Sequence, residues 1–306
     1  MLEVVGLSRS FGPVRALGGA SFEVKPGRLT GFVGANGAGK TTAMRIIMGV
    51  LRADAGEVRF KGRPIDRQVD ATFGYMPEER GLYPKMAVRE QLVFLAQLHG
   101  LTRAKAGSNA DRLLERLGLA ERGKDPVEKL SLGNQQRAQI AAALVHDPAA
   151  LILDEPFSGL DPMAVDTVMG VLGEFAAQGA PILFSSHQLD VVERITDDLV
   201  IIAAGQIKAA GATAALRESL AGSRYRLDLP AGRETDWIAT FPGLGDVSVS
   251  RGGDGGGGAA SGIVWSFEAS PDDAQRVLRQ ALAEGPVTRF ERVIPPLSEV
   301  FREVIA

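Results

Sequence analysis

The sequence predicts an α/β fold with a buried parallel sheet, followed by a smaller α+β domain. Residues 29–33 form an apolar run that leads into a glycine-rich loop and then a helix-compatible segment. Residues 149–153 form a second apolar run without alternation, which is typical of a strand buried on both faces of a parallel sheet. Beyond residue 224, short alternating segments surround one helical segment. The chain has 306 residues, which is enough for two domains.

The loop after the first apolar run has the composition of a phosphate-binding P-loop. Its residues are Gly34, Ala35, Asn36, Gly37, Ala38, Gly39, Lys40, Thr41 and Thr42. Glycines let backbone N–H groups face a polyphosphate, while Lys40 can reach the outer phosphates and the Thr41 hydroxyl can ligate Mg²⁺. The following helix adds its positive dipole end to the same site. A plain glycine-rich turn is the alternative, but the full motif between strand and helix favours a nucleotide site.

Two acidic residues, Asp154 and Glu155, come directly after the second apolar run. Ligands of doubly wound sheets bind at the carboxyl ends of the strands, so we expect these side chains beside the P-loop. There, Asp154 would hold Mg²⁺, directly or through water, and Glu155 would polarise a water aimed at the γ-phosphate. Ordinary solvated acids at a strand end are the alternative, which the P-loop in the same chain disfavours.

A helix with a serine N-cap is expected after residue 131, because Ser131 precedes a segment with an apolar face. With the P-loop and the acidic pair, this segment resembles the signature LSGGQ of the ATP-binding subunits of ABC transporters. Leu132 stands where the family has glycine, and Asn134 where it has glutamine. The match rests on Leu130, Ser131, Gly133, Gln135, Gln136 and Arg137. A helix that is merely capped is the alternative.

The resemblance implies a dimer in which each cassette completes the site of the other. Two ATP molecules would lie between two subunits, with Ser131 and Gly133 acting on the ATP held by the second subunit's P-loop. Phe11 matches the residue that stacks on adenine, Asp161 matches the D-loop at the dimer seam, and His187 matches the switch histidine that contacts the γ-phosphate. The alternatives are a core aromatic role for Phe11 and a structural role for His187.

Glu78 departs from the family pattern. The family usually has a glutamine at this point, which senses Mg²⁺ and the attacking water, whereas this chain has Glu78 after Pro77. A carboxylate can still ligate Mg²⁺, although it places a negative charge near the phosphates. We therefore predict that Glu78 takes over the role of the glutamine, both as a metal ligand and in catalysis.

The charge, the lack of cysteine and the length of the apolar segments limit the kinds of partner and compartment that are expected. A formal net charge of −3 lacks the basic footprint of nucleic-acid binding, so no nucleic-acid partner is expected. The absence of cysteine fits a reducing compartment. The first residues lack a signal-peptide pattern, and the longest apolar segment, residues 140–153, is interrupted by His146, Asp147 and Pro148. With the resemblance, this predicts a soluble chain held at the cytoplasmic face of the plasma membrane by a separate transmembrane permease subunit.

Residues 1–210 are predicted to form the ABC cassette, with a helical insert at about residues 84–146. Antiparallel strands are expected in residues 1–30 and 55–64, where apolar and polar positions alternate around turns. The first helix of the insert would begin after Ala87, where family members often carry a threonine N-cap. In the family this insert docks on the membrane subunit. Its expected apolar stripe consists of Val88, Leu92, Leu95 and Leu98.

Residues 211–306 are predicted to form a linker helix and a small α+β domain. The expected elements are a linker helix over 213–223, strands over 225–229, 263–267 and 287–293, and a helix over 272–283. A glycine-rich linker is expected over residues 251–258. This domain resembles the C-terminal extension of drug- and ion-export ATPases of the family.

We expect an ATP-binding and ATP-hydrolysing subunit that dimerises on ATP and powers a membrane ABC exporter. A soluble ABC ATPase acting on nucleic acid or ribosomes is one alternative, but such proteins usually carry a coiled-coil insertion or two cassettes. A non-catalytic nucleotide-binding regulator is another, which the intact Glu155 and His187 argue against. The expected catalytic residues are Lys40, Glu78, Glu155 and His187, and the expected Mg²⁺ ligands are Thr41, Glu78 and Asp154.

Overall fold

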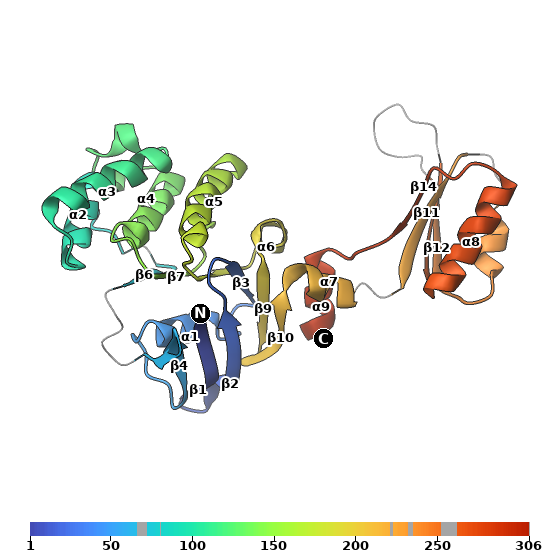
Figure 1. The fold of residues 1–306 in the computed structure, drawn as a ribbon, viewed down its shortest axis with the longest axis horizontal. Coiled ribbons are helices and arrows are strands. Elements are labelled where there is room, and N and C mark those ends of the chain that lie inside the picture. Colours follow the sequence, from blue (N-terminus) through green and yellow to red (C-terminus); the bar gives the residue numbers. More distant parts are fainter. Residues whose placement is uncertain (66–71, 80, 221–222, 232–234, 252–261, 306) are drawn as a thin grey trace. The chain divides into compact units, whose positions relative to one another are not determined.

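The computed structural model describes residues 1–65, 72–79, 81–220, 223–231, 235–251 and 262–305 (Figure 1). By its internal contacts the chain divides into two units, one of Met1–Thr213 with Phe301–Ala306 and one of Ala214–Val300. The first unit contains the P-loop and all other candidate site residues. The grouping of the last residues with the first unit had no signal in the sequence.

The first unit is built on a six-stranded sheet with the strand order β10-β9-β3-β8-β7-β6. Neighbouring strands in it are parallel, except that β10 pairs antiparallel with β9. Every residue of β3, β7 and β8 is buried, so the predicted buried parallel strands are confirmed. The strands are β3 (Leu29–Val33), β6 (Phe73–Met76), β7 (Ala150–Leu153), β8 (Ile182–Ser186), β9 (Asp198–Ala203) and β10 (Gln206–Ala212).

A second sheet in the first unit is antiparallel, with the order β2-β1-β4-β5. Its strands are β1 (Leu2–Phe11), β2 (Val14–Val24), β4 (Ala55–Phe60) and β5 (Arg63–Pro64), as the alternation in the sequence predicts. Both sheets share one core with helix α1 (Lys40–Ile47), which includes Leu7, Phe22, Phe32 and Met44. Because this core holds β3 and α1, it fixes both ends of the P-loop that joins them.

Three helices form the predicted insert: α2 (Val88–Leu98), α3 (Arg103–Arg116) and α4 (Leu132–Leu144), with 3-10 turns at Ala120–Arg122 and Val127–Lys129 (Figure 1). The amide of Asn109 on α3 donates to the carbonyl of Val145 at the end of α4, over 2.8 Å. The predicted stripe is correct at Val88 and Leu92, which are buried, but wrong at Leu98, which is 66% exposed. Leu98 is the last residue of α2. The buried residue that follows Leu92 on the same face of the helix is Ala96.

Helices also connect the parallel strands: α5 (Pro162–Ala177) follows β7, and α6 (Leu189–Ile195) follows β8. Both lie between strands that run in the same direction, as crossover connections require. None of the described helices combines the length and apolarity needed to cross a bilayer.

The second unit contains the four-stranded antiparallel sheet β12-β13-β11-β14, and helix α8 packs on it. Its core includes Leu227, Trp265 and Phe267 of the sheet and Val277 of α8. The segments predicted from the sequence correspond to α7, β11, β13, α8 and β14. Strand β12 and helix α9 were not predicted. Residues 252–258 of the expected glycine-rich linker lie outside the described residues. The bounds are α7 (Thr213–Leu220), β11 (Arg224–Leu229), a 3-10 turn (Asp236–Thr240), β12 (Leu244–Arg251), β13 (Ile263–Ala269), α8 (Pro271–Glu284), β14 (Arg289–Arg292) and α9 (Leu297–Ile305).

The N-cap of α2 predicts a stabilising substitution. Ala87 occupies this position and makes no side-chain cap bond, while Glu90 stands at the third helical position. Ala87→Ser would supply a hydroxyl that accepts from the Glu90 N–H, which completes a capping box, so we expect a gain of about 1 kcal/mol in the free energy of unfolding. Chemical denaturation measures it. As a control, Thr102→Ala removes the cap of α3 and should lose a similar amount. A serine at position 87 that gives no gain while the control loses stability would contradict the expectation.

His146 predicts a loss of stability in mild acid. Its ring is buried and stacks on His99, with 3.7 Å between ring centres, and its Nε2 lies 3.2 Å from the carbonyl oxygen of Phe73. Burial, with a smaller effect of His99, lowers the pKa of His146 from 6.5 to about 4. Between these two values the unfolded chain binds a proton that the folded protein does not, so stability falls as the pH is lowered.

We expect His146 to contribute a stability loss on the order of 1 to 3 kcal/mol between pH 7 and pH 4.5. His146→Gln should therefore depend less steeply on pH than the wild type over this range. Denaturation midpoints measured at several pH values test this, and parallel curves for the two proteins would rule out the assignment.

Candidate nucleotide-binding site

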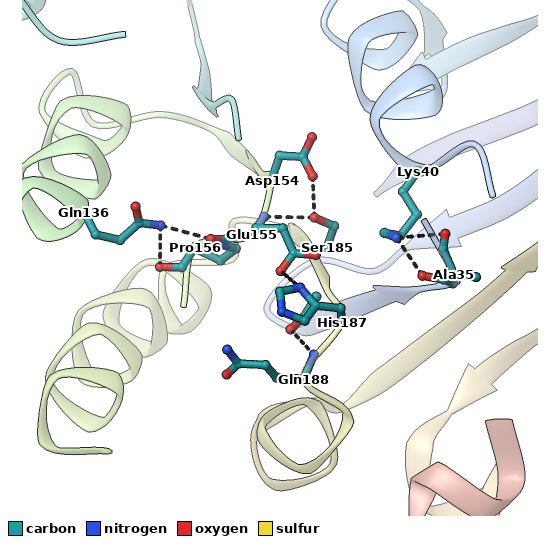
Figure 2. Close-up of polar contacts among 11 residues, drawn as sticks. Ala35, Lys40, Gln136, Asp154, Glu155, Pro156, Ser185, His187 and Gln188 are labelled. Atoms are coloured by element: carbon teal, nitrogen blue, oxygen red, sulfur yellow. Dashed lines mark hydrogen bonds and ion pairs between the residues drawn. The ribbon is translucent and has the colours of Figure 1, made fainter. Parts of the chain in front are cut away.

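The P-loop has a backbone that only glycine accepts at its key positions. Gly39 has a φ of +109°, and a Cβ there would lie 2.5 Å from the carbonyl oxygen of Ala16. At Gly34 a Cβ would lie 2.4 Å from the carbonyl oxygen of Ile202. Lys40 begins α1 and folds back over the loop, where its Nζ donates to the Gly34 carbonyl over 2.6 Å and to the Ala35 carbonyl over 3.3 Å (Figure 2). The sequence therefore produces a tight loop in which the Lys40 ammonium is bonded to carbonyls of the loop itself.

A pocket of about 410 Å³ lies at this loop. It brings together residues that are widely separated in the sequence, from the P-loop, from the loop after β6, from the end of β7 and from the end of β8. The lining consists of Ala16, Asn36, Gly37, Gly39, Lys40, Thr41, Thr42, Glu78, Asp154, Glu155 and His187. Of these only Ala16, on β2, was not a candidate from the sequence. The remaining P-loop candidates, Gly34, Ala35 and Ala38, belong to the same loop but do not line the pocket.

Asp154 is almost fully buried, with 1% of its surface exposed, and its two oxygens differ. Oδ1 accepts a 2.5 Å hydrogen bond from the Ser185 hydroxyl on β8 (Figure 2). Oδ2 has no hydrogen-bond partner among the described residues. A buried carboxylate oxygen without a partner is costly, and a pocket that holds one beside a threonine hydroxyl fits a divalent cation. The donor set of Asp154 and Thr41 therefore suits Mg²⁺, which needs few protein ligands because it retains water and phosphate oxygens.

Glu155 is held in a strained conformation. Its φ is +52°, a left-handed value that a residue other than glycine rarely adopts. Its N–H donates to the Ser185 hydroxyl over 2.9 Å, and its carbonyl accepts from Nε2 of Gln136 over 2.9 Å. Its Oε2 lies 3.0 Å from Nδ1 of His187, so the carboxylate and the imidazole meet at the pocket (Figure 2).

The pocket carries an excess of negative charge. Glu78, Asp154 and Glu155 all line it, against the single ammonium of Lys40. The pKa of the Tyr75 hydroxyl on β6 is raised, mainly by burial and in addition by the negative charge of Asp154. A bound divalent cation would offset the three carboxylates.

Besides Gly34, Ala35 and Ala38, four other candidate residues do not line the pocket. Ser131 caps α4, with its hydroxyl accepting from the Asn134 N–H over 3.4 Å, and Gly133 lies in the first turn of that helix. Asp161 caps α5 through a 2.8 Å bond from the Ala164 N–H. The fourth, Phe11, is described next.

Phe11 ends β1 and is 48% exposed, with the guanidinium of Arg9 at 5.0 Å from its ring centre. The alternative in which Phe11 is a core aromatic residue is therefore wrong. An exposed aromatic face is available for stacking.

Two polar residues hold the acidic pair in place. Ser185 was not a candidate from the sequence, and Gln136 was named there only as part of the signature match. Ser185 bonds both Asp154 and Glu155, and Gln136 bonds the carbonyls of Glu155 and Pro156. Both residues are buried, although serine and glutamine usually are not. Neither position has a periodicity that distinguishes it in the sequence.

Comparisons with known proteins identify the family of this chain. Residues 17–158 match the family model described as ABC transporter, and residues 211–305 match the model described as ATP-binding protein DrrA1-3-like, C-terminal domain. The chain is 34% identical over 305 residues to the uncharacterized ABC transporter ATP-binding protein YhaQ of Bacillus subtilis, covering 100% of this chain and 98% of the relative. It is 32% identical over 245 residues to the daunorubicin resistance ATP-binding protein DrrA3 of Streptomyces coeruleorubidus, covering 79% and 78%.

Solved structures point the same way. A structure described as the ATP binding subunit of an ABC transporter matches with a TM-score of 0.67 and 32% identity, over 72% of this chain and 93% of that one. Fold, pocket and relatives thus agree, and the chain belongs to the ABC transporter family as an ATP-binding protein with a DrrA-like C-terminal domain.

Proposed function

We propose that this chain binds and hydrolyses ATP as a homodimer and thereby powers a separate membrane exporter. The pocket carries the proposal, because it joins a P-loop to Glu78, Asp154, Glu155 and His187 and contains a buried carboxylate oxygen without a partner. We further propose that residues 1–210 form the cassette, with the helical insert at about 84–146, and that residues 211–306 form the additional domain.

In the proposed reaction, Lys40 and the loop N–H groups bind the phosphates of ATP. Thr41, Asp154 and Glu78 would hold Mg²⁺, which neutralises charge on the β- and γ-phosphates when bound. Glu155 accepts a proton from the attacking water. The water oxygen bonds to the γ-phosphorus while the bond from the γ-phosphorus to the β,γ-bridging oxygen breaks and ADP leaves. The 3.0 Å contact with His187 supports this role, since it fixes the direction of the carboxylate.

The residues outside the pocket support a dimer. The 13-residue helix α4 presents its N-terminus at Ser131, where the N–H groups of the first turn and the helix dipole favour an anion. We propose that Ser131 and Gly133 bind the γ-phosphate of the second copy's ATP and that Asp161 lies at the seam. Phe11 would stack on the adenine of its own site, since its ring is half exposed.

The membrane partner is proposed from the relatives and the charge. DrrA3 and the linearmycin resistance protein LnrL of Bacillus subtilis, which is 34% identical over 225 residues, are named as resistance ATP-binding proteins. These names, with the DrrA-like C-terminal domain, support export as the direction of transport. We propose that the helical insert docks on a separate transmembrane permease at the cytoplasmic face of the plasma membrane. A net charge of −3 gives no support to a nucleic-acid partner.

The proposal predicts that Glu155→Gln abolishes turnover but not binding. Loss of the proton acceptor should lower kcat by about 100-fold or more, while ATP affinity is kept, because Lys40 and the P-loop are unchanged. Steady-state phosphate release and titration with a fluorescent ATP analogue measure the two quantities. Glu23→Gln, at an exposed position of β2, is the control and should match the wild type.

Two outcomes would contradict the proposal. Equal, near-zero turnover in the wild type and Glu155→Gln would favour a nucleotide-binding regulator. A Glu155→Gln protein that stays monomeric in saturating ATP, even with its membrane partner, would remove the dimer.

Glu78 predicts a change in metal dependence. If its carboxylate holds Mg²⁺, Glu78→Ala should lower kcat and raise the Mg²⁺ concentration needed for half-maximal turnover by roughly tenfold. Glu78→Gln, which restores the usual family residue, should remain within a few-fold of the wild type. The neighbouring Glu79→Ala is the control, since Glu79 does not line the pocket. Unchanged turnover and Mg²⁺ dependence in Glu78→Ala would assign the role to another residue.

A further inference from the structure

The buried face of α4 carries two glutamines one turn apart, Gln136 and Gln139, which are 6% and 4% exposed. Both side chains reach out of the helix to backbone carbonyls of other segments. Gln136 bonds the carbonyls of Glu155 and Pro156. Gln139 donates from Nε2 to the carbonyl of Pro77 over 2.8 Å and to that of Glu79 over 3.2 Å. Helix α4 therefore forms hydrogen bonds with both acidic segments of the pocket, the one that follows β7 and contains Glu155 and the one that follows β6 and contains Glu78.

The two carbonyls bound by Gln139 flank Glu78 on either side. β6 ends at Met76, so Glu78 lies in a loop without ladder hydrogen bonds of its own. A single amide that donates to the carbonyls of Pro77 and Glu79 restrains the loop on both sides of Glu78. Gln139 therefore bonds the backbone on either side of a residue that lines the pocket.

A purely structural role explains this amide poorly. Gln139 stands between the buried apolar residues Ala138 and Ile140 in the sequence of α4, and its Oε1 has no hydrogen-bond partner among the described residues. A buried acceptor without a partner costs stability, which an apolar side chain of similar size would avoid. What the amide adds is its two hydrogen bonds to the carbonyls of the loop that contains Glu78.

We propose that Gln139 is a positioning residue that keeps Glu78 at the nucleotide pocket and ties its loop to α4. The inference rests on the proposed function, because it concerns ATP hydrolysis. It adds a physical link between the two ends of the proposed mechanism: Ser131, at the start of α4, would meet the second copy's ATP, while Gln139 in the same helix holds a residue at the chain's own ATP.

Gln139→Met tests the proposal, since methionine has a similar length but no N–H donor. We expect kcat to fall about tenfold with the KM for ATP within twofold of the wild type, because the P-loop is untouched. Gln139→Glu, which also lacks the donors and directs acceptors at the two carbonyls, should show the same split. Melting temperatures of both variants establish that they fold.

Gln91→Met is the matched control. Gln91 is 1% exposed and also bonds the backbone of a residue downstream of Glu78, accepting from the Tyr83 N–H over 2.7 Å and donating to the Tyr83 carbonyl over 3.3 Å. It should lose stability like Gln139→Met but keep kcat within twofold. Equal losses of kcat in Gln139→Met and Gln91→Met would mean that any loosening of this loop lowers kcat, and this result would overturn the proposal.

A double-mutant cycle decides whether Gln139 acts through Glu78. If it does, Gln139→Met added to Glu78→Ala should change kcat less than twofold, although it costs tenfold in the wild type. Equal fold losses in both backgrounds, or wild-type kcat in Gln139→Met, would overturn the proposal while leaving the proposed function intact. A wild type without turnover would overturn the proposed function itself.

Discussion

The parallel pairing of β6, β7, β8 and β3 is the constraint on which the site depends. Parallel strands end at the same edge of a sheet, so the residues that follow them meet whatever their distance in the chain. The loops after these strands carry Glu78, Asp154 with Glu155, His187 and the P-loop, and all four contribute to one pocket. Ser185 shows how tight this arrangement is, because a hydroxyl on β8 bonds both acids at the end of β7.

The charges at this edge favour a cation and a polyphosphate together. Lys40 donates to two carbonyls of its own loop and is therefore a fixed positive group, and three carboxylates line the same pocket. Buried carboxylates without partners are unfavourable unless a metal or hydrogen bonds compensate. Oδ2 of Asp154 lacks such compensation among the described residues, which makes it the position where a divalent cation would lower the energy most.

Much of the fold and of the candidate site could be predicted, because strands, loops and caps leave local signals. The apolar runs of β3 and β7, the glycines of the P-loop and the serine cap of α4 are examples. β12 was missed because Gly245, Asp246 and the serines after it imitate a turn, and α9 because a short helix after Pro296 has too few residues to show a period. The contacts of Gln136 and Gln139 were not predicted for a different reason: their partners lie in distant segments, and a glutamine in a helix looks the same in the sequence whether it faces water or a carbonyl.

Helix α4 connects the parts of the site that the sheet alone does not connect. The left-handed backbone of Glu155 costs on the order of 1 to 3 kcal/mol. Two hydrogen bonds of about 1 kcal/mol each offset this cost: the Glu155 N–H donates to the Ser185 hydroxyl, and Gln136 donates to the Glu155 carbonyl. One of these bonds comes from the sheet and the other from α4. Displacement of α4 would therefore weaken the hold on Glu155 and on the loop of Glu78 at the same time. If Ser131 meets the second copy's ATP as proposed, α4 would transmit assembly of the dimer to the geometry of hydrolysis, because its buried face contacts both acidic segments.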